Sequence, residues 1–170
     1  MSPRAAWRLE SLGFQEVYDY EGGKQDWAAA GLAMEGTVAD LTRADDVARP
    51  DVPTCKLQDT LAEVRARTHG SGWDVCVVVN EERVVLGLLR RAQIQRPPDD
   101  ATVEDVMRPG PSTFRPNVDI REMAHYMDEH DLESAPITTS NGRLVGMLMR
   151  DDARREAHGG AEDTSPQEDM

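Results

Sequence analysis

Two stretches of the chain that align without a gap decide the fold. Residues 54–87 read TCKLQDTLAEVRARTHGSGWDVCVVVNEERVVLG, and residues 113–146 read TFRPNVDIREMAHYMDEHDLESAPITTSNGRLVG, at a constant offset of 59. Similarity at one fixed spacing indicates two copies of a structural unit that cannot bury a core alone. The 170-residue chain is therefore expected to fold around a repeat.

Each copy predicts a helix followed by two strands. Apolar residues spaced i, i+3, i+7 give each helix one buried face, formed by Leu61, Val64 and Thr68 in the first copy and by Ile120, Met123 and Met127 in the second. The strands are predicted over 75–79 and 84–89 in the first copy, and over 134–138 and 143–149 in the second. A polar turn separates the two strands of each copy.

The repeat also extends upstream of the aligned stretches. Residues 37–41 (TVADL) match residues 102–106 (TVEDV), at an offset of 65. This match predicts six extra residues in the first copy, within 44–53. Each unit then consists of a short helix, a strand, a helix, two strands and a helix, and the two units are expected to bury their sheets against each other.

This pattern resembles the CBS domain, which occurs as tandem pairs in regulatory proteins. The resemblance covers roughly residues 37–155 and rests on the T-V-x-D opening, on Ala135-Pro136-Ile137, on the NGRLVG turn and on the trailing Asp151-Asp152. It implies an α+β fold of two βαββα repeats packed sheet to sheet, at 37–97 and 98–155. It also implies a homodimer through the CBS helices.

Residues 1–36 lie outside the repeat and resemble the C-terminal third of a rhodanese domain. The residues that fall at that family's spacing are Gly13-Phe14, Gly22-Gly23, Trp27 and Gly31-Leu32. A helix is expected over 4–12, a strand over 16–20 and a second helix over 24–30.

The catalytic loop of the rhodanese family, a cysteine, four residues and an arginine, is missing from this resemblance. Thr60 stands five residues after Cys55 and Glu81 five after Cys76, so neither cysteine makes that pattern. We therefore assign no catalytic residue and expect a non-enzymatic protein. The alternative is that the chain is a truncated part of a rhodanese–CBS sulfurtransferase.

The charge of the chain limits its partners. Thirty-two acidic against nineteen basic residues give a net charge of −13, which disfavours nucleic acid and anionic membranes. No apolar run is long enough for a transmembrane helix, and Met1–Glu10 lack the apolar core of a secretory signal, so a cytoplasmic protein is expected. Residues 156–170 contain five acids and no Lys or Arg, and a disordered tail is predicted there.

The CBS resemblance implies a ligand site in the cleft between the repeats, where that family often binds adenosine nucleotides. The family motif is a glycine, two apolar residues, Ser/Thr, two variable residues and Asp. The second copy reads Gly146-Met147-Leu148-Met149-Arg150-Asp151-Asp152, which puts Asp152 at the ribose position and Met149 at the hydroxyl position. The opposite wall is expected from Pro53, Thr54, Trp73 and Val75, with Trp73 able to stack on a base.

The first copy departs from the motif at both diagnostic positions, with Arg90 for Ser/Thr and Gln93 for Asp. One asymmetric site per chain is therefore predicted, for AMP, ATP or S-adenosylmethionine. Asp151 is expected to disfavour highly charged tails. No metal site is predicted, because the helical pair Glu122 and His125 has no second pair to match it. A CBS pair that binds a protein partner and no small ligand is the remaining interpretation.

Overall fold

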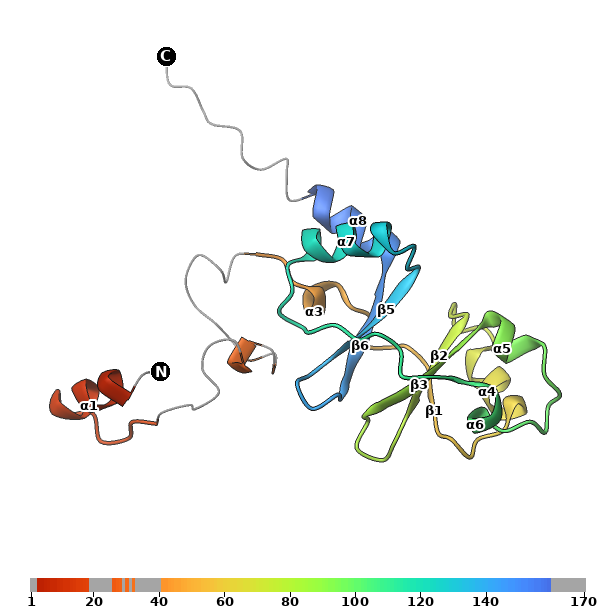
Figure 1. Ribbon diagram of the computed structural model, residues 1–170, viewed down its shortest axis with the longest axis horizontal. Helices are drawn as coiled ribbons and strands as arrows, with labels where there is room; N and C mark the ends of the chain where they lie inside the picture. The colour runs from red at the N-terminus through yellow and green to blue at the C-terminus, as the bar shows by residue number, and fades with distance from the viewer. Residues whose placement is uncertain (1–2, 19–25, 29, 31, 33–40, 160–170) are drawn as a thin grey trace, which may run out of the picture.

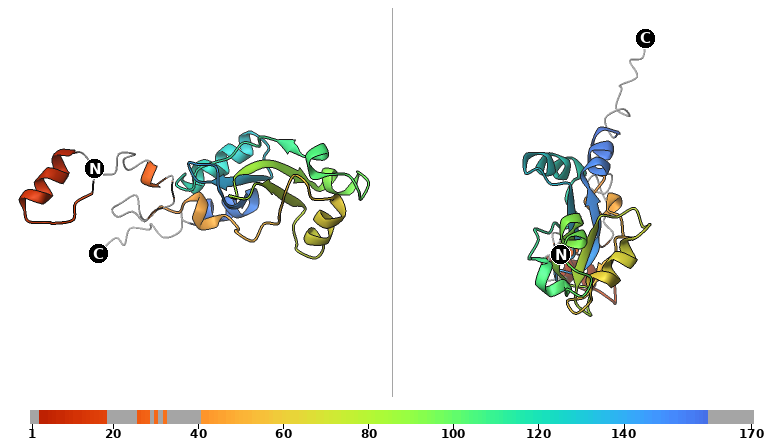
Figure 2. Two further views of the ribbon diagram at one scale, coloured as in Figure 1. Left: turned by 90° about the horizontal axis from the view of Figure 1, so that it is seen from below. Right: turned by 90° about the vertical axis from the view of Figure 1, so that its right-hand side faces the viewer.

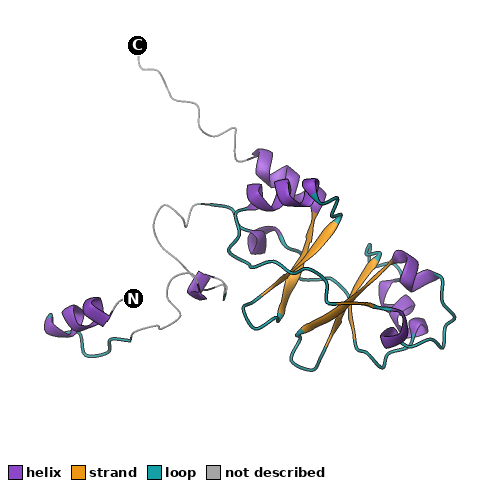
Figure 3. Cartoon of the chain, viewed as in Figure 1, coloured by secondary structure: helices purple, strands orange, loops and turns teal. Residues whose placement is uncertain are grey.

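The computed structural model describes residues 3–18, 26–28, 30, 32 and 41–159. Residues 41–159 form two halves, each a small sheet with helices on its outer side (Figure 1). Figure 3 shows the strands of both halves facing the middle of this region and the helices at its two ends. The expected α+β fold of two repeats is confirmed.

The first half is built from five elements. They are β1 (Thr54–Cys55), α4 (Leu61–Thr68), β2 (Val75–Val79), β3 (Val85–Arg90) and α5 (Arg91–Gln95). The run VCVVV of β2 is buried at every position, as expected for β-branched residues in a central strand. Thr60 caps α4 by accepting a hydrogen bond from the Glu63 amide, while the Glu63 carboxylate accepts one from the Thr60 amide.

The second half repeats this order with one strand shortened. Its elements are α7 (Ile120–Glu129), β5 (Ser134–Thr138), β6 (Leu144–Met149) and α8 (Arg150–Gly159). In the first half, the Val77 amide donates to the Pro53 carbonyl over 2.9 Å. Pro136 stands at the matching position and has no amide hydrogen, so that bond cannot form. Only a parallel bridge between Phe114 and Ile137 therefore takes the place of β1.

The two halves exchange their leading segments. Helix α3 (Ala44–Val47) packs against α7, α8 and β6 of the second half, whereas α6 (Val103–Val106) contributes to the core of the first half. The backbone bonds are equivalent on both sides. The Ala44 amide donates to Val118 and the Val103 amide to Asp59, each over 2.9 Å. Neither half is complete without a segment that lies before the other half in the chain.

A shared core joins the inner faces of the two sheets. Buried side chains of both halves meet there, namely Val52, Val75, Val77, Val79, Leu88, Leu144 and Met147. The hairpin tips also pair, because Val85 N donates to Gly142 O at 3.0 Å and Leu144 N donates to Arg83 O at 2.9 Å. Figure 2 shows the same two halves from two further sides. The sheets thus pack together as the repeat predicted.

The structure corrects the upstream alignment. Helices α3 and α6 occupy equivalent places and are 59 residues apart, so residues 44–49 (ADDVAR) correspond to residues 103–108 (VEDVMR). The match of residues 37–41 to 102–106 was wrong, and the six extra residues do not exist. Residues 37–40 lie outside the described residues. The T-V-x-D string occurs by coincidence at residues 37–40 and 102–105. The true counterpart of residues 103–109 is residues 44–50, and the two segments share an Asp-Val pair and an Arg-Pro pair at the offset of 59.

The ends of the chain differ from expectation as well. Helix α1 (Pro3–Ser11) forms close to the predicted helix, but Glu16–Tyr18 are irregular, so the strand predicted over 16–20 is absent there and its last two positions are not described. Helical turns at 26–28 match part of the helix predicted over 24–30. Helix α8 continues to Gly159, so the predicted disordered tail was wrong over 156–159, and 160–170 lie outside the described residues.

Two equivalent glycines let the exchanged segments cross the sheets closely. Short β4 (Arg108–Pro109) pairs with β3 beside Gly87, and Arg49 bridges to Met147 on β6 beside Gly146. A Cβ atom at Gly146 would lie 2.8 Å from the Arg49 carbonyl oxygen. At Gly87 it would lie 2.5 Å from the sulfur of the flexible Met107 side chain and 3.0 Å from the Arg108 carbonyl oxygen, so the backbone contact is looser there. Gly146 therefore faces the less yielding neighbour.

Gly146→Ala is expected to destabilise the protein by about 1–3 kcal/mol, because the Arg49 backbone must shift to admit the methyl group. Gly87→Ala is the matched control and should cost less, since the Met107 side chain can rotate away. Urea unfolding of both variants measures the difference. Equal losses would contradict the assignment of backbone crowding to Gly146.

Candidate functional site

A buried carboxylate begins the last helix. Asp152 lies in the first turn of α8 and is only 6% exposed. Its Oδ2 atom accepts a hydrogen bond from Arg49 Nε at 2.6 Å and lies 2.6 Å from Arg49 Nη2, and its Oδ1 atom lies 3.1 Å from Arg155 Nη2. Both carboxylate oxygens are therefore engaged by guanidinium groups, which offset the cost of burying the charge.

The exchanged segment brings Arg49 to this carboxylate from 103 positions earlier in the chain. The Arg49 backbone is fixed on β6, because it exchanges two 2.9 Å hydrogen bonds with Met147. The Arg49 side chain remains 52% exposed. The backbone of Arg49 is therefore held in place, while its side chain is accessible to solvent.

Trp73 completes the group. The guanidinium carbon of Arg49 lies 5.9 Å from the centre of the indole ring, within the range of a cation–π contact. The indole nitrogen of Trp73 donates to Asp51 Oδ2 at 3.3 Å. Trp73 is half-buried and packs against the shared core with Met149. The geometry thus links Trp73, Arg49 and Asp152 in a row.

The other residues predicted for the site differ in their exposure to solvent. Val75 is 2% exposed and belongs to the shared core. Pro53 and Thr54 are half-buried, and their carbonyl groups accept bonds from the Val77 amide and the Arg67 side chain. Asp151 is exposed and does not line the pocket at Asp152.

A pocket of about 450 Å³ opens beside Asp152. Its lining joins the exchanged segment to α8 and consists of Thr42, Asp46, Val47, Arg49, Asp152, Arg155 and Glu156. Two arginines and three carboxylates face the same space. Because Asp152 is held by both arginines, a ligand group that pairs with Asp152 would free guanidinium groups for an anion.

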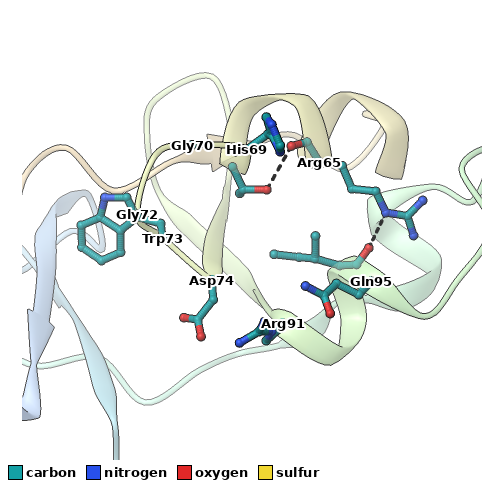
Figure 4. A pocket seen from close by; sticks show the side chains of 10 residues that line it. Arg65, His69, Gly70, Gly72, Trp73, Asp74, Arg91 and Gln95 are labelled. Carbon is teal, nitrogen blue, oxygen red and sulfur yellow. Dashed lines mark hydrogen bonds between the residues drawn. The ribbon is translucent and has the colours of Figure 1, made fainter.

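A larger pocket of about 590 Å³ lies in the first half, between the end of α4, the loop before β2 and α5 (Figure 4). Of the predicted site residues it contains Trp73 alone. Arg65 on its wall is already engaged, with Nε donating to the Ile94 carbonyl at 2.8 Å and its other nitrogens contacting Pro97 and Asp99. This pocket lacks the buried carboxylate that a ribose would need.

The equivalent position in the first half has different chemistry. Gln93, which replaces the aspartate, accepts a hydrogen bond from the Arg90 amide at 3.2 Å and so caps α5. The Arg90 side chain donates to Ser134 Oγ at 3.3 Å. Arg108, the counterpart of Arg49, is exposed. The two halves therefore differ at the position where the second holds its carboxylate.

Both cysteines are unsuited to carrying sulfur. Cys55 and Cys76 are free thiols that are 2% and 0% exposed. Their contact raises the pKa of the Cys76 thiol, first through a hydrogen bond with Cys55 and then through burial. A nucleophilic thiolate needs exposure and a lowered pKa, so neither cysteine fits that role.

Within the described ranges, no three His, Cys, Asp or Glu side chains gather as a metal site would require. No helix described in the structure has the length and hydropathy to cross a membrane.

Comparisons with known proteins agree with the observed fold. The CBS domain model matches residues 103–159. Three solved structures share the fold over 69–71% of this chain, with TM-scores of 0.60–0.61 and 16–23% identity. The first is the cytosolic domain of the Mg²⁺ channel MgtE in complex with ATP, and this chain covers 50% of it. The second is the CBS pair of MJ0100 in complex with 5′-methylthioadenosine and S-adenosyl-L-methionine, of which it covers 98%. The third is CBSX2 in complex with AMP, of which it covers 96%. The fold is that of a CBS pair.

Two curated relatives are similar in sequence. The Methanopyrus kandleri protein MK0525 is 27% identical over 116 residues, and an inosine-5′-monophosphate dehydrogenase of Korarchaeum cryptofilum is 29% identical over 123 residues. The alignments span 63% and 69% of this CBS pair's chain, but 58% and 25% of the relatives. The chain thus corresponds to part of each relative.

Arg49, like Arg155, is a site residue that the sequence did not reveal. A signal for it exists, because Arg49-Pro50 and Arg108-Pro109 recur at the offset of 59. The mistaken offset of 65 hid this pair. Only the exchange of segments in the CBS pair places Arg49 against Asp152.

A double-mutant cycle should detect the ion pair. Arg49→Met and Asp152→Asn are expected to show a coupling of about 1 kcal/mol in the free energy of unfolding, because Arg49 is half-exposed while its partner is buried. The coupling should shrink between 50 mM and 1 M salt. Strictly additive losses at low salt would mean that the contact contributes nothing to stability.

Proposed function

We propose that this CBS pair is a non-enzymatic regulatory module that binds an adenosine-containing ligand beside Asp152. The observation that carries the proposal is a carboxylate, 6% exposed, at the first turn of α8, next to a 450 Å³ pocket. In this structure Asp152 is paired with the side chains of Arg49 and Arg155, which are 52% and 69% exposed, so the proposal requires a pair of ribose hydroxyls to replace these partners.

The surrounding side chains supply the other groups that a nucleotide requires. Arg49 and Arg155 line the same pocket and offer hydrogen-bond donors to a phosphate. Trp73 lies beside Arg49 and presents an aromatic face to an adenine ring. The proposed site residues are thus Asp152, Arg49 and Arg155 on the pocket lining, together with Trp73 and Met149, which lie outside that lining and pack against the shared core.

Similarity to solved structures supports the ligand class. Proteins with the same fold hold ATP, AMP or S-adenosyl-L-methionine. At 16–23% identity these structures support the fold alone. The proposal of an adenosine-containing ligand therefore rests on the residues at Asp152. The site at Arg90 and Gln93 offers no carboxylate to a ribose, which favours one ligand per chain.

Titration calorimetry with AMP tests the proposal. The wild-type chain should bind one AMP, and Asp152→Ala should weaken binding about ten- to a hundredfold, because a charged acceptor for two hydroxyls is lost. Gln93→Ala, the equivalent change in the first half, should leave the affinity unchanged. Loss of binding in Gln93→Ala with retention in Asp152→Ala would place the ligand in the other half of the pair.

A second candidate function is a CBS pair that recognises a protein partner and no nucleotide. It is favoured by the two guanidinium groups that already occupy both oxygens of Asp152. Under this interpretation the ion pairs are structural, and no adenosine ligand binds at millimolar concentration in the titration above. The sulfurtransferase alternative gains nothing from Cys55 or Cys76, because both are buried.

A homodimer through α4, α5, α7 and α8 stays a prediction. Among the described residues, the large apolar side chains that are exposed all fall within positions 7–41. A dimer through the CBS helices therefore has to rest on polar and small apolar contacts.

A further inference from the structure

Arg49 holds the groups that the proposed ligand would need. Its two nitrogens lie 2.6 Å from Asp152 Oδ2, the acceptor proposed for the ribose. Its guanidinium plane is near the Trp73 ring, the face proposed for the base. One side chain thus bridges the two ends of the nucleoside site.

The anchor of Arg49 restricts how this arrangement can change. The backbone of Arg49 exchanges two hydrogen bonds with Met147, which hold it on β6 beside Gly146. The side chain is 52% exposed and can rotate toward the solvent side of the pocket. Release of Asp152 therefore needs only side-chain torsions and leaves the guanidinium near the pocket, together with Arg155.

We propose that Arg49 acts as an internal occupant of the Asp152 site and makes the site selective for anionic nucleotides over uncharged nucleosides. The inference rests on the proposed function. Adenosine has to displace Arg49 from Asp152 and offers the freed guanidinium nothing in return. AMP displaces it equally but supplies a phosphate, and a guanidinium binds phosphate through two parallel hydrogen bonds.

This inference replaces the expectation drawn from Asp151. That residue is exposed and lies outside the pocket lining, whereas Arg49 and Arg155 are part of it. The groups nearest a phosphate are then the two guanidinium groups released from Asp152. Asp46 and Glu156 also face the pocket, and their charge sets a limit on how many phosphates it favours.

The chain contains a matched control for Arg49. Arg108 stands at the same place in the first half, because it pairs with Leu88 as Arg49 pairs with Met147. Its half has Gln93 in place of the buried carboxylate. Removing Arg108 takes away the same side chain from an equivalent backbone position without touching Asp152.

The test compares the affinities of AMP and adenosine by calorimetry for the full chain, Arg49→Met and Arg108→Met. The wild type and Arg108→Met should bind AMP at least about tenfold more tightly than adenosine. In Arg49→Met, adenosine should bind more tightly than it does to the wild type, and the preference for AMP should fall to about threefold or less. Arg49→Gln, which keeps a polar side chain, serves as a second variant if Arg49→Met does not fold.

The outcomes separate this inference from the proposed function. An unchanged preference for AMP in Arg49→Met overturns the role of Arg49 and leaves the site at Asp152 intact. Binding of adenosine by Arg49→Met but of neither ligand by the wild type supports the internal occupant and removes the sensor function. Absence of binding in every protein overturns both.

Discussion

Exchange of the two leading segments is the constraint on which the rest of the structure depends. Helix α3 completes the second half and α6 completes the first, through backbone bonds that are equivalent on both sides. The core of each half includes a buried residue of the exchanged segment, Ala44 in the second half and Val103 in the first. The two repeats therefore form one unit, and the residues that connect α3 to β1 are forced to cross the second sheet. Arg49 lies on that crossing.

The crossing explains why the proposed ligand site lies at Asp152 and not at the equivalent Gln93. Both halves receive an arginine at the equivalent position, Arg49 or Arg108. Only the second half presents a carboxylate to it, Asp152, and only there does an aromatic ring, Trp73, lie beside the guanidinium. Leu132 stands at the position that corresponds to Trp73. Two differences between the copies, Gln93 against Asp152 and Trp73 against Leu132, thus distinguish the surroundings of Arg49 from those of Arg108.

Much of the fold could be predicted from the repeat. The strands at 75–79 and 134–138 and the two long helices follow from local apolar patterns, which depend on neighbouring residues. Asp152 and Met149 followed from the family motif, and Trp73 was expected on the opposite wall; Trp73 and Met149 pack against the same core, and Arg49 links Trp73 to Asp152. The ion pair with Arg49 could not be predicted, because it joins residues 103 positions apart and exists only through the exchange. The offset of 65 failed for a simpler reason: three identical letters in the T-V-x-D string were preferred to the four identical letters that residues 44–50 and 103–109 share at the offset of 59.

The central claim, that an adenosine nucleotide displaces Arg49 from Asp152, is tested most directly by nuclear magnetic resonance of the isotope-labelled chain during titration with AMP. The Arg49 Nε–Hε signal reports the bond to Asp152, and the Trp73 indole signal reports the neighbouring ring. The account predicts that both signals move together and saturate at one AMP per chain, while the Trp7 indole signal stays in place. Saturation that shifts the amides of Arg90 to Gln93 and leaves Arg49 and Trp73 unmoved would contradict it.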